Sequence, residues 1–276
     1  MRMPKAEVKE VNIYYKVHGQ GEPLLLIMGL TGIQRAWVFQ IRAFKKYYQV
    51  ITFTNRGRGK ADKPSEPYTV KMMAEDTVGL MDYLRVDKAH ILGLSLGGMI
   101  AQEMAINHPE RVRKLILAST TAGGRAIGDT PLELQRAMGL KGDSSEANMR
   151  GVDFRSMDFE KVMRATVSLS FNKRLFRMVF VPLSKIHLKR IGLSNFMAQF
   201  VATRTHNTLD RLHLIEAPTL VITGTRDRLV PPHYSEVLAS RIPHAKLVKV
   251  EGGSHSLFME MRGRFNKEVL DFLRDS

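Results

Sequence analysis

A serine bounded by glycines is the residue of this chain best suited to covalent chemistry. Ser95 stands within Gly93–Gly98, between an apolar run and a segment with helical spacing. In this context the G-x-S-x-G pattern predicts a nucleophile on a sharp turn from strand to helix. Gly93 and Gly97 leave room for the strained backbone of such a serine, and we expect the Leu96 N–H at the helix start to bind an oxyanion. The alternative is a glycine-rich turn with an incidental serine.

A histidine and an aspartate are placed to activate that serine. A serine hydroxyl needs an imidazole to take its proton, and the imidazole needs an acid to hold its tautomer. His255 ends the loop Glu251–His255 and Asp227 ends the segment Leu220–Asp227, each just after a predicted strand. Alone, they could be a hydrogen-bonded loop histidine and a helix N-cap or arginine partner. Because the order Ser, Asp, His matches the order expected after such a turn, we predict that Ser95, Asp227 and His255 form a catalytic triad.

A second donor for the oxyanion is expected in the loop after an earlier apolar run. Gly29-Leu30-Thr31-Gly32 lets the backbone turn toward the serine, and we assign the donor to the Leu30 N–H. The alternative is a glycine-rich turn with no catalytic contact. The chain has no cysteine, and no pair of histidines has metal-ligand spacing supported by acids. We therefore predict neither a metal nor a cofactor.

The order of strands and helices predicts an α/β fold that brings these loops together. Apolar runs predict a strand or a hairpin at 8–17 and strands at 23–28, 48–53, 90–94, 112–119, 218–223 and 245–250. Helical spacing predicts helices at 69–84, 96–108, from about 231 onward, and 257–273. This alternation requires right-handed crossovers, and hence a doubly wound, mostly parallel sheet with helices on both faces.

A long segment interrupts this alternation. Residues 121–214 lack β-type runs and are too long for a plain loop, so we predict a helical cap inserted after the sixth strand. The domain division is then a core of residues 1–120 and 215–276 and a cap of residues 121–214. The cap holds Phe and Met residues expected to form an apolar pocket wall, although more than half should be cap core. These residues are Phe154, Phe159, Met163, Phe171, Phe176, Phe180, Phe196, Met197 and Phe200.

The formal charge of +15 requires an explanation. The segment 161–209 carries nine basic residues and no carboxylate, and is the one local concentration of charge. A solvated cap face is the favoured interpretation, with weak contact to anionic lipid or attraction of acidic substrates as alternatives. Nucleic acid is not an expected partner, because the predicted strands are of the buried type and offer no exposed basic and aromatic surface.

The amino-terminal residues mix charges without an apolar stretch. We therefore expect no signal peptide, no membrane anchor and no stable membrane insertion, and a cytoplasmic location. The oligomeric state is left open between a monomer and a homodimer.

The sequence resembles the α/β-hydrolase superfamily over nearly all of its length outside the cap. The resemblance rests on the serine turn, on the acid and base segments described above, on Arg56–Gly59, which matches the family's R-G-x-G, and on Asn107–Val112. Met28 stands before Gly29, where the family usually has histidine. The backbone donor does not depend on that side chain, so the oxyanion hole should survive the change.

Within the superfamily, the serine separates this chain from members that use an aspartate nucleophile, namely haloalkane dehalogenases and epoxide hydrolases. The sequence is most similar to carboxylesterases, enol-lactonases and cofactor-free haloperoxidase or perhydrolase-like members, which share the serine turn. The resemblance and the apolar cap imply a serine esterase for small hydrophobic esters. The alternatives are a lactonase, a C–C bond hydrolase, a perhydrolase-like activity, and a protein of this fold that binds a small molecule without turnover.

Overall fold

A single eight-stranded sheet forms the centre of the molecule. The computed structural model describes residues 4–9, 11–30, 32, 34–57, 68–123, 131–139, 158–191 and 193–275, with the backbone alone at 184–191, 193 and 197. The strands are β1 (Lys5–Val8), β2 (Val11–His18), β3 (Glu22–Ile27), β4 (Tyr48–Phe53), β5 (Ala89–Leu94), β6 (Val112–Ala118), β7 (Thr219–Gly224) and β8 (Ala245–Val250).

The order of the strands determines where a ligand can bind. The sheet runs β1-β2-β4-β3-β5-β6-β7-β8, parallel from β4 to β8, with β1 and β2 antiparallel. From β3 the chain moves outward to β4 and then returns to the opposite side of β3 as β5. In α/β proteins the crevice at the carboxyl ends of two such strands is the usual ligand site. Ser95 directly follows β5, and Gly29 lies two residues after β3, so both stand at this reversal.

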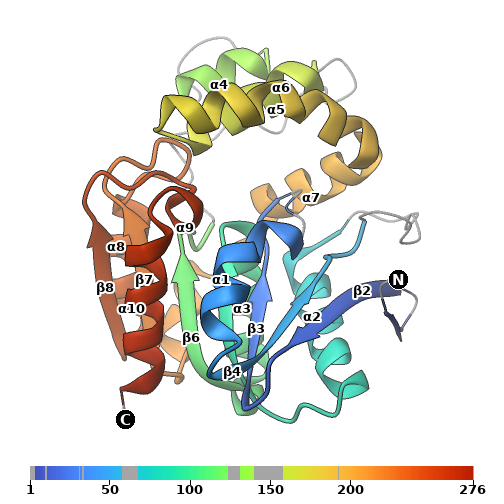
Figure 1. Ribbon diagram of the computed structural model, residues 1–276, viewed down its shortest axis with the longest axis vertical. Helices are drawn as coiled ribbons and strands as arrows, with labels where there is room; N and C mark the ends of the chain where they lie inside the picture. Colours follow the sequence, from blue (N-terminus) through green and yellow to red (C-terminus); the bar gives the residue numbers. More distant parts are fainter. Residues whose placement is uncertain are drawn as a thin grey trace.

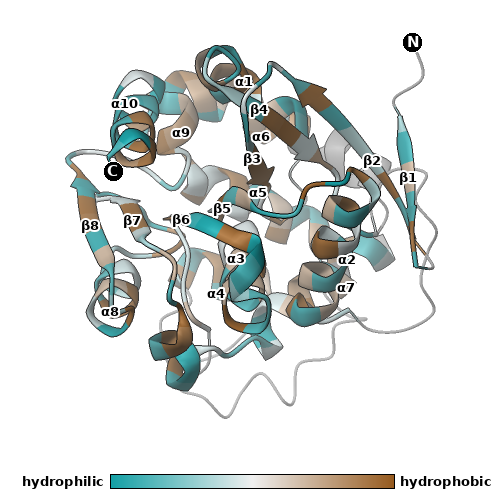
Figure 2. Cartoon of the chain, turned by 90° about the horizontal axis from the view of Figure 1, so that it is seen from below, coloured by the Kyte–Doolittle hydropathy of each residue, from teal (hydrophilic) through white to brown (hydrophobic). Residues whose placement is uncertain are grey.

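Helices cover both faces of the sheet (Figures 1 and 2). One face is covered by α2, α3 and α8, and the other by α1, α9 and α10. These helices are α1 (Val38–Phe44), α2 (Val70–Tyr83), α3 (Leu96–Asn107), α8 (His233–Arg241), α9 (Leu257–Glu260) and α10 (Arg262–Arg274). Successive residues of β3 alternate between the two cores, because side chains of a strand point to opposite faces in turn.

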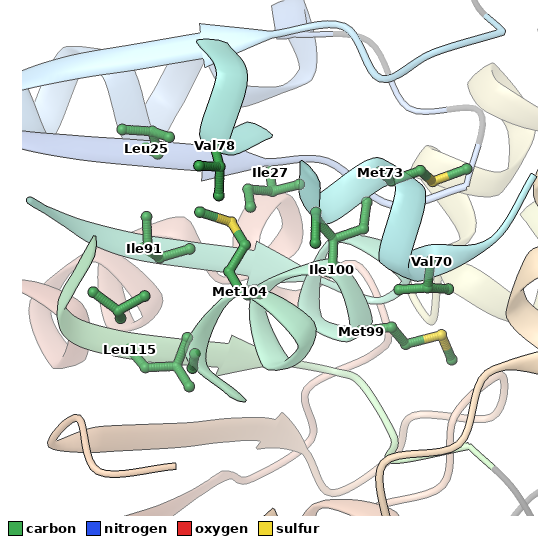
Figure 3. Packing of buried hydrophobic residues seen from close by; sticks show 14 of the residues in the cluster. Leu25, Ile27, Val70, Met73, Val78, Ile91, Met99, Ile100, Met104 and Leu115 are labelled. Carbon is green, nitrogen blue, oxygen red and sulfur yellow. The ribbon is translucent and has the colours of Figure 1, made fainter. Parts of the chain in front are cut away.

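A buried hydrophobic cluster packs α2 and α3 against the sheet (Figure 3). Met99, Ile100 and Met104 of α3 pack in the same buried cluster as Ile91 of β5 and Leu115 of β6. Because α3 begins at the residue after Ser95, this packing also fixes the position of the serine.

In the described part of the chain between β6 and β7, four α-helices lie over the carboxyl edge of the sheet (Figure 1), and we call them the cap. They are α4 (Leu132–Ala137), α5 (Phe159–Ser170), α6 (Arg174–Ile191) and α7 (Leu193–Thr205). The cap has its own buried cluster, which includes Met163 and Phe196. At its base the outgoing and returning chains pair: Gly123 and Asn207 form an antiparallel bridge, and Thr208 N donates to Ala122 O at 2.9 Å.

The expected fold is confirmed, including the insertion after the sixth strand. Three details differ from the prediction. The first strand, β1, begins at Lys5, ahead of the range 8–17 that was expected to hold the first strand or hairpin. The expected last helix is broken at Met261 into α9 and α10, and the helix α1 was not anticipated. Among the helices that the structure describes, none combines the length and the apolarity needed to cross a bilayer.

Candidate active site

The backbone at Ser95 is strained and firmly held. Its φ of 54° and ψ of −120° lie outside the regions that serine ordinarily occupies. Ser95 N donates to Ala118 O at 2.9 Å, while Ser95 O accepts from Gly98 N at 2.8 Å and from the Thr120 hydroxyl at 2.7 Å. These bonds keep the serine at the tip of the turn between β5 and α3.

The glycines around the turn allow backbone segments to approach closely. A Cβ at Gly93 would lie 2.2 Å from Gly97 O, and a Cβ at Gly97 would lie 2.1 Å from Ile27 O. Both distances are too short for any side chain, and the atoms that a Cβ would meet belong to the backbone. The predicted need for small residues at these two positions therefore has a direct steric cause.

The two loops after β7 and β8 bring the predicted acid and base together. We call residues 225–232 the acid loop and residues 251–256 the base loop. Asp227 Oδ2 lies 2.9 Å from His255 Nδ1, and both side chains are buried. The other carboxylate oxygen, Oδ1, accepts from Leu229 N at 2.9 Å and from Val230 N at 2.8 Å. The carboxylate is thereby fixed in orientation, with one oxygen turned to the imidazole.

The loop after β3 lies against the serine. A Cβ at Gly29 would lie 3.1 Å from Ser95 Cβ, so Leu30, the next residue, is close to the nucleophile. Leu96 is the first residue of α3, and the N–H of such a residue has no acceptor within its own helix. The donor roles of the Leu30 and Leu96 N–H groups stay a prediction that this geometry permits. The Met28 side chain is buried, and a Cβ at Gly32 would meet it at 2.1 Å, so it fills the space behind the loop.

Ser95 and His255 line the same cavity, and Asp227 lies behind the imidazole. The cavity has a volume of about 640 Å³ and is lined mainly by apolar side chains of the core and the cap. Met28, Gly29 and Leu30 also border it. The structure thus gathers the residues predicted to act, which come from four separate loops, at the carboxyl edge of the sheet.

Of the cap residues predicted for the pocket wall, only some reach the cavity. Met163, Phe171, Phe180 and Phe200 line the cavity. Phe159 and Phe196 belong to the cap core, and Phe176 stacks on Phe171 at a centroid separation of 5.6 Å. Phe154 lies outside the described residues, as does the Met197 side chain.

The R-G-x-G segment is described only in part, because residues 58–59 lie outside the described residues. Arg56 of that segment forms a buried ion pair with Asp76, in which 2.7 Å separates Nη2 from Oδ1.

The sequence interpretation missed the polar side chains of the cavity wall. Arg35, Arg204 and Tyr234 border the cavity. The Arg204 guanidinium lies 5.2 Å from the Phe200 ring centroid, and burial lowers its pKa below the usual value, against an opposing effect of Tyr234. No spacing distinguishes Arg204 from the other basic residues of the cap, so only the fold could place it here.

Comparison with known families identifies this architecture. The family model for the alpha/beta hydrolase fold matches residues 22–261. The chain belongs to the α/β-hydrolase fold family. Among relatives of this α/β-hydrolase, a putative carbamate hydrolase, RutD, of Rhizobium rhizogenes is 30% identical, and the alignment covers 95% of this chain and 98% of that protein. A putative non-heme bromoperoxidase, BpoC, of Mycobacterium tuberculosis is 29% identical, with 95% and 97% covered.

Solved structures of other hydrolases have the same fold as this chain. The enol-lactonase of Burkholderia xenovorans LB400 superposes on this α/β-hydrolase with a TM-score of 0.83 at 25% identity, covering 99% of this chain and all of that one. The family and its named members support a hydrolase. Their names differ in the bond that is cleaved, so the substrate has to be argued from the site itself.

Proposed function

We propose that this α/β-hydrolase is a serine carboxylesterase that cleaves esters with a hydrophobic acyl group through an acyl-enzyme intermediate. The observation that carries the proposal is the 2.9 Å contact between Asp227 and His255, with His255 and Ser95 on one apolar cavity. An acid that orients an imidazole beside a strained serine is the arrangement that activates a hydroxyl for attack on a carbonyl.

The reaction then has two halves. His255 takes the proton of the Ser95 hydroxyl as the oxygen attacks the ester carbonyl, and Asp227 stabilises the imidazolium that forms. The Leu30 and Leu96 N–H groups donate to the oxyanion, and His255 returns the proton to the leaving alcohol. Water, activated by the same imidazole, attacks the acyl-serine and releases the acid. The proposed roles require no group beyond these side chains and the backbone.

The cavity wall supports the choice of substrate. Its cap side is formed by Met163, Phe171, Phe180 and Phe200, which can bind an alkyl or aryl acyl group by apolar contact. The volume of about 640 Å³ accommodates a small ester and exceeds what an acetyl group alone would fill. We therefore expect higher kcat/KM for butyrate and hexanoate esters than for acetate.

A lactonase is the second candidate. It is favoured by the likeness to the enol-lactonase, and by Arg204 in the cavity wall, whose charge suits a lactone that carries a carboxylate. A panel of neutral esters, neutral lactones and anionic lactones separates the two candidates. Higher kcat/KM for the anionic lactones, lost in R204M, would favour the lactonase.

The decisive test is hydrolysis of p-nitrophenyl butyrate together with labelling by a fluorophosphonate. We expect S95A to abolish both, and H255N to reduce the labelling rate by about 1,000-fold or more, because the hydroxyl loses its base. S240A is the matched control, since Ser240 is an exposed serine that bonds only to Val237 O among the described residues. Turnover in S95A equal to the wild type, or labelling of Ser95 that does not depend on His255, would contradict the proposal.

A further inference from the structure

The connection between α5 and α6 touches both loops that carry the acid and the base. Asn172 stands in this connection, and its side-chain amide donates to Arg226 O at 3.1 Å and to Gly252 O at 3.5 Å. Arg226 precedes Asp227 in the acid loop, and Gly252 belongs to the base loop. One cap residue therefore joins the two catalytic loops at their backbones.

A buried carboxylate reinforces this junction from the core side. Glu260 is 6% exposed and ends α9. Its Oε1 accepts from Lys173 N at 2.6 Å, and its Oε2 accepts from Asn172 N at 3.2 Å and from the Ser254 hydroxyl. The Lys173 ammonium donates to Glu260 O at 2.9 Å. Because Lys173 immediately precedes α6, the carboxylate also stands at the positive end of that helix.

The same bonds hold the backbone on both sides of His255. Ser254, which donates to Glu260, accepts from Ser256 N at 3.1 Å. Ser256 N also donates to Ser170 O, at the end of α5, at 2.9 Å. The imidazole is therefore carried by a short segment whose two neighbours are both bonded into one network with the cap.

We propose that Glu260 is a positioning residue for His255. It joins the α5–α6 connection to the base loop, so that the cavity wall and the imidazole are fixed relative to each other. A buried carboxylate that receives N–H and O–H donors stabilises one arrangement strongly, and its loss leaves those donors without an acceptor. The proposal rests on the proposed function only in that His255 acts as a base. The contacts themselves do not depend on the substrate.

The first test compares E260Q with E236Q in p-nitrophenyl butyrate hydrolysis, with active sites counted by fluorophosphonate titration. Glutamine keeps the volume of Glu260 but replaces one acceptor oxygen by an N–H₂ group that faces donors. We expect kcat per titrated site to fall about 10-fold in E260Q, which corresponds to one lost charge-assisted hydrogen bond. Glu236 is exposed and pairs with Lys249 at 3.1 Å, so E236Q should stay within about twofold of the wild type.

This measurement separates positioning from a merely structural role. A structural role lowers the number of titrated sites or the melting temperature and leaves kcat per site unchanged. An unchanged kcat per site in E260Q would overturn the proposal. If E260Q does not fold, S254A takes its place, because it removes only the Ser254 hydroxyl, which donates to Glu260 and accepts from Ser256 N. We expect S254A to lower kcat per site severalfold, and an unchanged value would equally overturn the proposal.

Amide hydrogen exchange tests the junction without any substrate. The backbone N–H groups of Asn172 and Lys173 donate to Glu260, so in E260Q they should exchange about 10-fold faster or more than in wild type and E236Q. Unchanged exchange would overturn the proposal whatever the activity. If the wild type shows no ester turnover while exchange at these two amides responds as expected, the proposed function fails and the junction stands.

Discussion

At Ser95, backbone atoms rather than side chains set the available space. The nearest atoms to a Cβ at Gly97 would be Ile27 O at 2.1 Å and Ile27 C at 2.6 Å, both part of β3. Neither can rotate away as a side chain could. A methyl group at Gly97 must therefore push α3 away from the sheet, and α3 carries the Leu96 N–H at its first turn.

We predict that G97A lowers both stability and activity. Forcing a methyl group into a closely packed site costs about 1–3 kcal/mol, so the free energy of unfolding should fall by about 2 kcal/mol. A displacement of the turn by a fraction of an ångström should lower kcat/KM for p-nitrophenyl butyrate by about 10-fold or more. Chemical denaturation and steady-state kinetics measure the two effects.

Gly263 supplies the matched control for this change. It lies in α10, and a Cβ there would have nothing within 4 Å. The same substitution, G263A, should leave activity unchanged and raise the free energy of unfolding by about 0.5 kcal/mol, because alanine favours the helix. Equal effects of G97A and G263A would argue against steric control of the turn.

At the scale of the structural elements, we expect the stability of the cap base to depend on pH through one histidine. His206 precedes the bridge between Asn207 and Gly123 and is buried. Burial lowers its pKa to about 4, with Glu103 raising it and Arg211 lowering it further. The imidazole Nδ1 lies 3.6 Å from a Glu103 carboxylate oxygen, and Arg211 pairs with the same carboxylate at 2.8 Å.

We predict that His206 makes the fold less stable in acid. Above pH 6.5 the imidazole is neutral in both folded and unfolded chains, so its contribution is fully present. As the pH falls from 6.5 toward 4, the unfolded chain binds a proton that the folded chain does not, and stability decreases. The total loss is about 3 kcal/mol for a shift of this size. Urea unfolding between these pH values should show a flatter pH dependence in H206Q than in the wild type.

The exposed His244 provides the comparison for this experiment. H244Q should follow the wild-type pH dependence closely, because this substitution leaves His206, Glu103 and Arg211 in place. If the free energy of unfolding depends on pH in the same way in the wild type and in H206Q, His206 is not the group whose protonation lowers stability. The variants are compared with one another because carboxylates also titrate in this range.

At the scale of the whole molecule, the basic cap also carries a row of exposed apolar side chains. On α6, Leu175, Met178, Val179 and Leu183 are between 47% and 69% exposed and follow one another at helical spacing. Arg174, at the start of the same helix, is exposed, and the segment 161–209 carries nine basic residues without a carboxylate. Apolar side chains flanked by basic ones favour an interface with anionic lipid over contact with a second, equally basic cap.

We therefore predict weak binding to vesicles of phosphatidylglycerol at low salt. Binding should be lost at about 0.5 M salt, where charges are screened within a few ångströms, and on vesicles of phosphatidylcholine alone. M178E should weaken the binding, and E236Q, away from the cap, should not. Co-sedimentation measures both. If co-sedimentation with the vesicles depends neither on salt nor on M178E, another surface binds the lipid. If the protein does not co-sediment at low salt, the basic residues are a solvated face.

Most of the fold could be predicted because each buried strand is an apolar run of its own. Leu24–Ile27 and Ala89–Leu94, for example, are buried throughout, and such strands need no tertiary information to be recognised. The helix α1 could not be predicted in this way. It follows a glycine-containing loop, and Phe44 packs into a core that it shares with α10, a helix more than 200 residues away in the sequence.

The gathering of Ser95, Asp227 and His255 at one edge of the sheet could be predicted for a similar reason, because these residues stand next to strand ends whose order follows from the topology. The cavity wall could not. Whether Arg204 or Phe196 faces the cavity depends on how the cap helices are rotated, which no spacing reveals. Glu260 in sequence is an ordinary carboxylate near a helix end, and its partners Asn172 and Lys173 stand nearly 90 residues away.

The bridge between Gly123 and Asn207 means that the chain leaves the sheet and returns to it at almost the same point. A segment with adjoining ends can be lengthened, shortened or exchanged without altering the distance between β6 and β7. The cap helices can therefore be exchanged in evolution or by protein engineering, which would change the wall of the cavity while Ser95 stays in place. Besides its ends and the contacts with Glu260, the cap is attached to the core at several described points, among them the Gln199 amide, which donates to Arg56 O, and Ser168 O, which accepts from Arg228. Any replacement must again present two backbone N–H groups to Glu260, or the imidazole will lose its support.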